Sequence, residues 1–504
     1  MRIRIPFTRF PVCLLLAFLP LSAVTVTAAT LLPSTEIPEL RESADLSDGQ
    51  EAMRRKDYAA ALLIFTRKAD SGNAAALFAL GYMHQHGLGV DASAMASETF
   101  YWQAAKLGNV AAMHNLAVLL AARPGSVAEA TEWLTKAAEK GSGRAALAMG
   151  RLITDGPNAK TQAADAESWF RKAVQAPELK EEASFTLAVF LDPTLTGTDG
   201  RSKEGRKFLE SSAEAGYQPA VLALSDALLR TKEGARAVEV LRKGDAAGST
   251  EAAFRLASLN FEGRVMPANP AEALRLYTKA AEAGHPAACN QLASLYQAGK
   301  GGVAADPVKA WEWFLKAATL GLPMGQFNAG VCLEDGLGVA KNPAGACQWY
   351  CQAALSGYAP AQNRLGLRYQ EGQGVMKDPV AARAWLREAA MQGFEAAMLN
   401  YAAMLAGGQG GPRDIPNAVT LYKSLAGKNH PDALHGLGLL MESGLAGPVD
   451  PPRALALQQL AADRNPAAKA RAEALLKVLS PEDKTKAAAY VKDPRTLFPA
   501  KTEG

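Results

Sequence analysis

Residues 284–318 read GHPAACNQLASLYQAGKGGVAADPVKAWEWFLKAA, and this stretch decides the fold. Its first half carries apolar residues at the spacing of one helix face, as far as Leu295. Gly299 ends that helix, because glycine adopts the positive φ of a helix terminus without strain. Asp306 and Pro307 begin a second helix, since aspartate caps free N–H groups and proline suits the first helical position. The stretch therefore predicts two helices joined by a glycine-rich turn.

The second predicted helix has its own apolar stripe, formed by Ala310, Trp313, Phe314 and Ala317. Alanine at most contact positions lets the two helices approach closely, and we expect Trp313 to fill the gap between them. One helix pair of this kind cannot bury its apolar face by itself, whereas stacked copies can. The stretch therefore requires neighbours of the same kind.

Those neighbours are visible as a repeat period along the chain. Five of the seven tryptophans share a lattice of 36 residues: Trp133, Trp169, Trp313, Trp349 and Trp385. A second lattice, of 36 or 37 residues, is formed by glycines: Gly248, Gly284, Gly321, Gly357 and Gly393. A fixed period of this length is the signature of stacked repeats. We therefore predict an all-α fold, a right-handed α-solenoid of helix-turn-helix repeats of about 36 residues each.

The repeat pattern is A-x-x-x-L-G-x-x-Y, then G-x-G-V, then D-P-x-x-A-x-x-W and A-A-x-x-G. This pattern resembles the Sel1-like repeat, a relative of the tetratricopeptide repeat. The best copies are residues 72–105, 284–318, 321–354 and 357–390. The resemblance implies an α-solenoid with roles in envelope assembly, export complexes or signalling.

The copies are unequal, and their differences divide the chain into segments. We expect a signal peptide at 1–29, a linker at 30–48, an N-terminal half-repeat similar to a tetratricopeptide helix at 49–71, Sel1-like repeats at 72–174, degenerate repeats at 175–247, Sel1-like repeats at 248–465, C-terminal capping helices at 466–493 and a tail at 494–504. The turn from Ala121 to Ser126 is shortened and lacks the G-x-G-V sequence. The stretch from Asp192 to Gly205 reads as an irregular polar loop, so the degenerate segment is either a row of poor repeats or a bend.

The N-terminal segment has the three parts of a secretory signal peptide. Three arginines precede an apolar run from Val12 to Leu19, and small residues lead to a cleavage point near Ala28 or Ala29. We therefore expect export, to the periplasm or as a secreted protein. The alternative is an uncleaved membrane anchor, because residues 10–29 are apolar enough to span a bilayer. Membrane contact is expected only through this segment.

The overall charge and hydropathy exclude several classes of protein. Apolar residues make up 49% of the chain and charged residues 21%, which excludes a disordered protein. The mean hydropathy of −0.06 excludes a polytopic membrane protein. The formal charge of +4 falls to +1 once the three arginines of the signal peptide are removed, so we expect no nucleic-acid partner.

No catalytic, cofactor or metal motif is specified by the sequence. The G-x-G turns follow helices, whereas a dinucleotide site needs a strand before its glycines. No spacing places a nucleophile beside a histidine, so we expect no enzyme activity, no cofactor and no metal. A possible disulfide joins Cys332 to Cys347 or Cys351 within one hairpin, and its connectivity stays open. Cysteine-rich Sel1-like proteins carry such pairs in most repeats, so this chain resembles them less and their penicillin binding transfers poorly.

The candidate partner site follows from the similarity to tetratricopeptide arrays, in which the first helices line the concave face. The residue before the core leucine of each first helix is then expected to point into the groove: Asn115, Gln291, Asn328, Arg364 and Asn400. An asparagine amide can bridge a peptide backbone, because it both donates and accepts hydrogen bonds. The plain alternative is a row of solvated polar positions.

These expectations together predict an exported Sel1-like repeat scaffold or adaptor that binds a protein or peptide partner on its concave face. Three alternatives stay open. The first is a cell-wall-related or penicillin-binding enzyme of the cysteine-rich Sel1-like type. The second is a luminal adaptor of eukaryotic protein quality control. The third is a structural spacer that binds partners only at its ends.

Overall fold

The computed structural model describes residues 46–195 and 200–497. The expected signal peptide, the linker up to residue 45 and the tail from residue 498 lie outside the described residues. Every regular element in these two described ranges is a helix, so the all-α prediction is confirmed. None of the helices in this part of the chain is long and apolar enough to cross a membrane.

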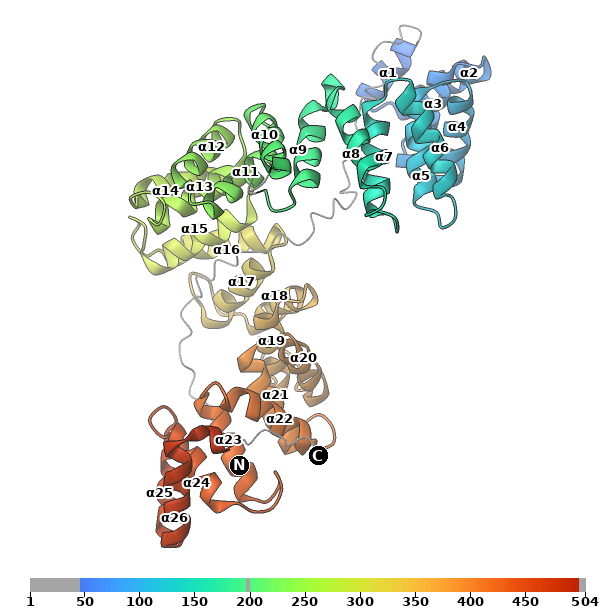
Figure 1. The fold of residues 1–504 in the computed structure, drawn as a ribbon. Coiled ribbons are helices and arrows are strands. Elements are labelled where there is room, and N and C mark those ends of the chain that lie inside the picture. Colours follow the sequence, from blue (N-terminus) through green and yellow to red (C-terminus); the bar gives the residue numbers. More distant parts are fainter. Residues whose placement is uncertain (1–45, 196–199, 498–504) are drawn as a thin grey trace. The chain divides into compact units, whose positions relative to one another are not determined.

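The chain divides into two compact units at Ala252, and within each unit the helices follow one another as hairpins (Figure 1). The helices of the first unit are α1 (Ser47–Arg54), α2 (Tyr58–Asp70), α3 (Ala74–His86), α4 (Ala94–Lys106), α5 (Val110–Ala121), α6 (Val127–Glu139), α7 (Gly143–Asp155), α8 (Ala163–Val174), the 3-10 helix η3 (Pro177–Leu179), α9 (Lys180–Leu191), α10 (Gly200–Glu214), α11 (Gln218–Arg230) and α12 (Gly234–Ala246). Helix α13 (Thr250–Glu262) crosses the boundary. The helices of the second unit are α14 (Pro270–Glu282), α15 (Pro286–Ala298), α16 (Pro307–Thr319), α17 (Pro323–Asp335), α18 (Pro343–Leu355), α19 (Ala359–Glu371), α20 (Pro379–Met391), α21 (Glu395–Gly407), α22 (Ile415–Ala426), α23 (Pro431–Glu442), α24 (Pro451–Ala461), α25 (Pro466–Val478), α26 (Pro481–Lys492) and the 3-10 helix η4 (Pro494–Leu497).

The helices pack as a stack of hairpins. Odd-numbered helices are the first helices of the hairpins and even-numbered helices are the second. A first helix packs on its own second helix, as α3 on α4, and that second helix packs on the next hairpin, as α4 on α5. Successive first helices also touch, as α5 with α7, α15 with α17 and α21 with α23. We call the surface made by the odd-numbered helices of a unit its first-helix face.

The signals that were expected to start and stop helices do so in the structure. Asp306, Asn342 and Asp378 each cap a second helix, with a side-chain oxygen that accepts a backbone N–H of the first turn. Gly299 ends α15 in the left-handed conformation, at a φ of 62°. Local sequence therefore fixes the ends of these hairpins, because the caps satisfy groups that a helix terminus leaves unbonded.

The gap between the two helices of a hairpin is filled by a different residue from the one expected. Trp313 is only partly buried, whereas Phe314, the next residue, is fully buried beside Ala293 of the first helix. All five lattice tryptophans are likewise partly exposed, and the residue after each is buried. The expectation for Trp313 was wrong because Trp313 and Phe314 are both apolar. Adjacent residues point about 100° apart around a helix, so only one of the two can face the first helix. The sequence pattern could not decide which of them faces the first helix.

The glycine-rich loops join one hairpin to the hairpin before it. In the loop after α17, the second glycine, Gly338, lies against the carbonyl oxygen of Pro307 at the start of α16, and any Cβ there would overlap that oxygen. Gly374 makes the same approach to Pro343 at the start of α18. The G-x-G loop of one repeat therefore covers the beginning of the preceding second helix.

The stretch expected to hold degenerate repeats forms helices α9 to α12. Residues 200–205 were expected as part of a polar loop but form the first turns of α10. Their charged side chains pair with helix α8, since Arg201 contacts Glu167 and Glu204 contacts Arg171, so polarity here does not indicate a loop. The structure also differs from the expected segments at both ends of the described chain. The expected half-repeat contains two helices, α1 and α2, and the start of the expected tail is η4, whose Leu497 is buried.

Candidate functional site

The five predicted groove residues all lie on first helices and are all partly buried. Their positions are Asn115 on α5, Gln291 on α15, Asn328 on α17, Arg364 on α19 and Asn400 on α21. Each residue occupies the same turn of its helix. Within the second unit, the four residues on α15, α17, α19 and α21 therefore form a structural column, whereas Asn115 belongs to the first unit. The assignment of these residues to a partner-binding groove stays a prediction.

Two asparagines of the column are used to join neighbouring repeats. The Nδ2 of Asn328 donates to the Oδ1 of Asn290 on α15, at 2.8 Å. The Nδ2 of Asn400 donates to the Oδ1 of Asn363 on α19, at 3.0 Å. Each pair links a first helix to the first helix of the preceding repeat. The Oδ1 of Asn328 and of Asn400 accepts no hydrogen bond from another described residue, so each amide keeps an acceptor on the first-helix face.

Arg364, between those two asparagines, belongs to a charged cluster around Glu334. The Nε of Arg364 lies 3.2 Å from one oxygen of Glu334, and a guanidinium nitrogen of Arg368 lies 3.4 Å from the other. The hydroxyl of Tyr350 donates to Glu334 at 2.6 Å. The Glu334 side chain is only 14% exposed, so its charge is stabilised by these partners more than by water.

The electrostatics of this cluster follow from burial and from the shared carboxylate. Burial raises the pKa of Tyr350 well above its usual value, and the negative charge of Glu334 raises it further. Tyr350 therefore stays protonated and acts as a donor. Burial opposes the charge on Arg364, but the Glu334 carboxylate, together with Tyr350 once that phenol ionises, outweighs it, so the pKa of Arg364 is raised overall. The cluster presents a positively charged, fixed guanidinium group on the first-helix face.

A second set of polar contacts was missed by the sequence analysis. The Nε2 of Gln362 donates to the carbonyl oxygen of Ala354 at the end of α18, at 3.1 Å, and Gln392 donates to the Oε1 of Gln362 at 2.8 Å. Gln326 occupies the equivalent position and donates to Ala318 at 3.5 Å. The signal that could have found this set is the 36-residue spacing of Gln326 and Gln362, on the same period as the tryptophans.

The four cysteines within the described residues are free thiols, and the possible bridge within the α17–α18 hairpin is not formed. Cys332 packs with Phe314 of the preceding repeat, where burial raises the pKa of its thiol to about 12. The Sγ of Cys347 instead donates to the carbonyl oxygen of Gln373 in the following loop, at 3.3 Å. The two thiols therefore contact different neighbours. Burial raises the pKa of Cys347 as well, which disfavours a reactive thiolate.

The histidines have structural surroundings. His285 caps α15, where its Nδ1 accepts the backbone N–H of Ala288 at 3.1 Å. The ring of His84 stacks on Phe100 at a centroid distance of 5.3 Å. Within residues 46–195 and 200–497, no group of three or more histidine, cysteine or acidic side chains is placed to hold a metal ion.

Comparison with known proteins agrees with this architecture. A family model described as the Sel1 repeat matches more than half of the chain, at residues 74–109, 110–142, 250–285, 286–322, 323–358, 359–394, 395–430 and 431–466. Among solved structures, a protective antigen of uropathogenic Escherichia coli strains with an SLR fold is 25% identical and has a TM-score of 0.55. The match covers 87% of this chain and 95% of the antigen chain. A Sel1 repeat protein from Oxalobacter formigenes is 29% identical over 47% of this chain and 94% of its own, with a TM-score of 0.42.

Proposed function

The chain belongs to the Sel1 repeat family, and on that premise we propose that it is an exported scaffold that binds a protein or peptide partner on its first-helix face. The protein acts by holding a preformed surface, so that little conformational entropy is lost when the partner binds. The first-helix face is the one that the similarity to tetratricopeptide arrays leads us to expect to be concave.

The observation that carries this proposal is the polar column along α15, α17, α19 and α21. Its asparagines are held in place by hydrogen bonds between repeats, and Asn328 and Asn400 each retain an acceptor oxygen. Arg364 is held by Glu334 between them. An extended peptide offers backbone N–H groups and carboxylates, which are the groups that such acceptors and a guanidinium recognise.

The proposal is tested by placing a photoactivatable crosslinking residue at Gln291 in the full-length protein, in its native compartment. Gln291 lies on the first-helix face of α15, and Glu312 on α16 of the same hairpin is the matched exposed control. We expect a partner to be captured from position 291 and not from position 312. Capture from position 312 alone would place the binding surface on the second helices and overturn the proposal.

A structural spacer that binds only through its ends makes a different prediction. Deleting residues 286–357 removes two whole repeats and keeps both ends of the array. A partner held on the first-helix face should then be lost or bound at least tenfold more weakly, with the helical circular dichroism per residue unchanged. Unchanged affinity of the shortened protein would favour the spacer instead.

Export is tested separately, because binding does not depend on it. Cell fractionation, followed by N-terminal sequencing of the mature protein, should place the chain outside the cytoplasm with a terminus near Ala29 or Thr30. An intact N-terminus in the membrane fraction would show that residues 10–29 anchor the chain. An intact N-terminus in the cytoplasmic fraction would contradict export.

A further inference from the structure

Three successive second helices of the second unit end in exposed apolar side chains. Leu355 is the last residue of α18 and is 73% exposed, and Met391 is the last residue of α20 and is 76% exposed. Leu320, directly after the last residue of α16, is 43% exposed. The three helices belong to successive hairpins of one unit, so these side chains follow one another along an edge of the stack. We call Leu320, Leu355 and Met391 the helix-end row.

The repeat fold does not require apolar residues at these helix ends. In five other hairpins the last residue of the second helix is exposed and charged: Asp70 of α2, Lys106 of α4, Glu139 of α6, Glu214 of α10 and Glu282 of α14. Leu107, directly after the end of α4, is 56% exposed, but the helix ends on either side of it are charged. A row of exposed apolar residues on neighbouring elements is typical of an interaction surface, whereas single ones are not.

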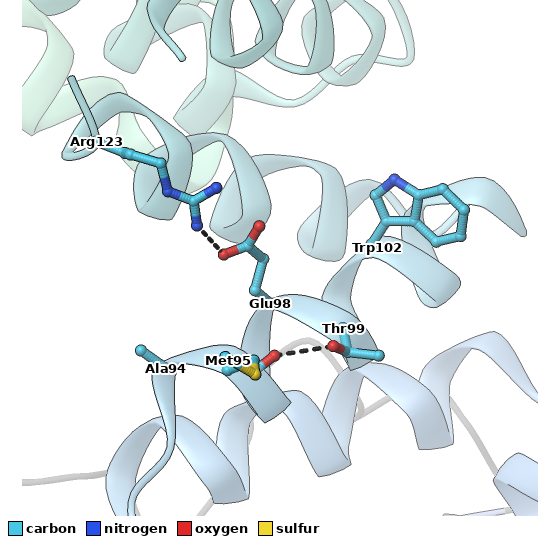
Figure 2. Close-up of a pocket in the computed structure, with 6 residues that line it drawn as sticks. All are labelled: Ala94, Met95, Glu98, Thr99, Trp102 and Arg123. Carbon is cyan, nitrogen blue, oxygen red and sulfur yellow. Dashed lines mark hydrogen bonds and ion pairs between the residues drawn. The ribbon is translucent and has the colours of Figure 1, made fainter. Parts of the chain in front are cut away.

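The hollow along α4 shows exposed apolar groups that are interleaved with charges. Figure 2 shows Met95, Glu98 and Trp102 on α4, with Arg123 facing Glu98. Glu98 and Arg123 form an ion pair, and the Nζ of Lys106 lies 3.9 Å from the centroid of the Trp102 ring. These groups therefore have partners within the chain. The last residues of α16, α18 and α20 are instead all uncharged.

The charged residues that flank the helix-end row reverse their sign about α18. One turn before the row lie Lys316 on α16, Gln352 on α18 and Glu388 on α20. One hairpin further away in each direction, Glu282 ends α14 and Lys428 follows α22. Each positive charge on one side of α18 thus corresponds to a negative charge on the other side, and α18 itself is uncharged at this end.

These charges remain accessible to a partner. The side chains of Glu388 and Lys428 are 47% and 62% exposed, although each also contacts an oppositely charged neighbour in its own chain. The Nζ of Lys316 donates to the carbonyl oxygen of Ala281 at 2.8 Å, which leaves its charge without a carboxylate among the described residues. Glu282 is exposed at the end of α14.

We propose that the helix-end row is the interface of a homodimer, in which a second copy of this chain lies antiparallel across α18 about a two-fold axis. The reversal of sign argues for this occupant, because the axis brings Lys316 opposite Glu388 of the second copy, and Glu282 opposite its Lys428. The same axis places Leu355 against Leu355, and Leu320 against Met391. The row is small for an interface, so we expect a dissociation constant of about 10–100 µM. This interface does not depend on the proposed function of the first-helix face.

The first test is sedimentation of the full-length protein up to about 500 µM. We expect a monomer–dimer equilibrium that Leu355→Glu weakens at least tenfold, because two carboxylates would then meet on the axis. Leu107→Glu makes the same change at the exposed end of α4 and should leave the equilibrium unchanged. Glutamate already ends α6, α10 and α14, so the circular dichroism of both variants should match the wild type. A wild type that stays monomeric, or a dimer that Leu355→Glu leaves intact, would overturn the proposal.

The second test locates the axis with introduced cysteines. Leu355→Cys should form a disulfide-linked dimer on mild oxidation, because the two side chains face each other on the axis. Leu320→Cys and Met391→Cys should each stay unlinked when alone and should link when the two variants are mixed. The wild type and Leu107→Cys are the controls and should not link. Linking of Leu320→Cys to itself, with no link in the mixture, would contradict an axis through α18.

Two further outcomes would assign the helix-end row to a different occupant. A monomeric wild type that binds phosphatidylcholine vesicles, and loses that binding in Leu355→Glu, would assign the row to a lipid surface. A monomeric wild type that crosslinks to a different protein from position 355, and not from position 107, would assign the row to that protein. Either result would overturn the homodimer.

Discussion

The regular repeats α15–α20 and the irregular stretch α5–α12 hold neighbouring hairpins together in different ways. In the regular repeats, G-x-G loops touch the backbone of the preceding helix, and buried side chains such as Glu334 join the first helices. In the irregular stretch, successive second helices are joined by exposed ion pairs, as Arg171 to Glu204 at 2.8 Å, with side chains 40% and 42% exposed. Backbone contact tolerates no added atom, whereas exposed ion pairs are weak and are screened by salt. The same stacking is therefore rigidly specified in one region and loosely specified in the other.

The largest effect should come from adding one methyl group to a loop of the regular repeats. Gly338→Ala places a Cβ into the carbonyl oxygen of Pro307 and also requires alanine at a φ of 74°. We expect a loss of about 3 kcal/mol or more in urea unfolding. Gly357→Ala is the matched control, because Gly357 has a φ of 81° but open space around it, so about 1 kcal/mol is expected. Equal losses would break the claim that loop contact specifies this region.

The next effect is a pH dependence that belongs to the irregular stretch. Burial, helped by the charge of Arg144, lowers the pKa of His114 on α5 from its usual 6.5 to about 4. Between these values the unfolded chain takes up a proton that the native chain refuses, so stability is full above pH 6.5 and falls as the pH approaches 4. The loss at pH 5 should be about 2 kcal/mol.

The control for His114 comes from the regular repeats. Asn290 and Asn363 occupy the position equivalent to His114, so His114→Asn introduces the residue of the regular region. In urea unfolding, the free energy of unfolding should fall between pH 7 and pH 5 by about 2 kcal/mol less in His114→Asn than in the wild type. An identical acid loss in both proteins would show that His114 does not carry the effect.

A smaller effect should distinguish buried charge from buried neutral polarity within the second unit. Tyr350→Phe removes the donor to Glu334, a largely buried carboxylate, and should cost about 1.5 kcal/mol in urea unfolding. Tyr277 occupies the same position but donates to the hydroxyl of Ser258 at 3.1 Å. Tyr277→Phe should therefore cost only about 0.5–1 kcal/mol. A larger loss in Tyr277→Phe than in Tyr350→Phe would mean that Arg364 and Arg368 stabilise the Glu334 carboxylate without the tyrosine.

The smallest effect should come from the exposed ion pairs. Glu204→Gln removes the partner of Arg171. The hydrogen bond from Arg171, helped by the positive charge of that residue, lowers the pKa of the Glu204 carboxyl. We expect a local loss of about 0.5 kcal/mol in hydrogen exchange of α10 at low salt, and no loss in 1 M NaCl, because salt screens exposed charges. Glu312→Gln, at an exposed position of α16, is the control and should change exchange at neither salt concentration. A loss that persists in 1 M NaCl would show that Glu204 contributes by packing.

Much of the fold was accessible from the sequence because the decisive interactions are local. The caps at Asp306, Asn342 and Asp378 and the turn at Gly299 act on residues within a few positions, and the structure confirms each of them. The all-α repeat architecture followed from the tryptophan and glycine periods. The choice between Trp313 and Phe314 failed for a physical reason, since adjacent apolar residues leave the rotation of a helix about its axis undetermined by pattern alone.

The candidate site was accessible only in outline. The polar column was placed on the first helices, but its pairing of Asn328 with Asn290 depends on how far one repeat is rotated against the next. The carboxylate that holds Arg364 comes from Glu334, in the preceding repeat and in a different register. No period in the sequence links those two positions, so this cluster could not be derived from spacing.

The sequence by itself determined the repeat, its two helices, their ends and the family to which the chain belongs. These features arise from interactions between residues that are near one another in the chain, and the same interactions recur in each copy of the repeat. Only the tertiary structure decided which polar groups meet across repeats and which large side chain enters each hairpin. Those outcomes depend on the rotation and spacing between hairpins, which the summed packing of many side chains sets and no single motif encodes.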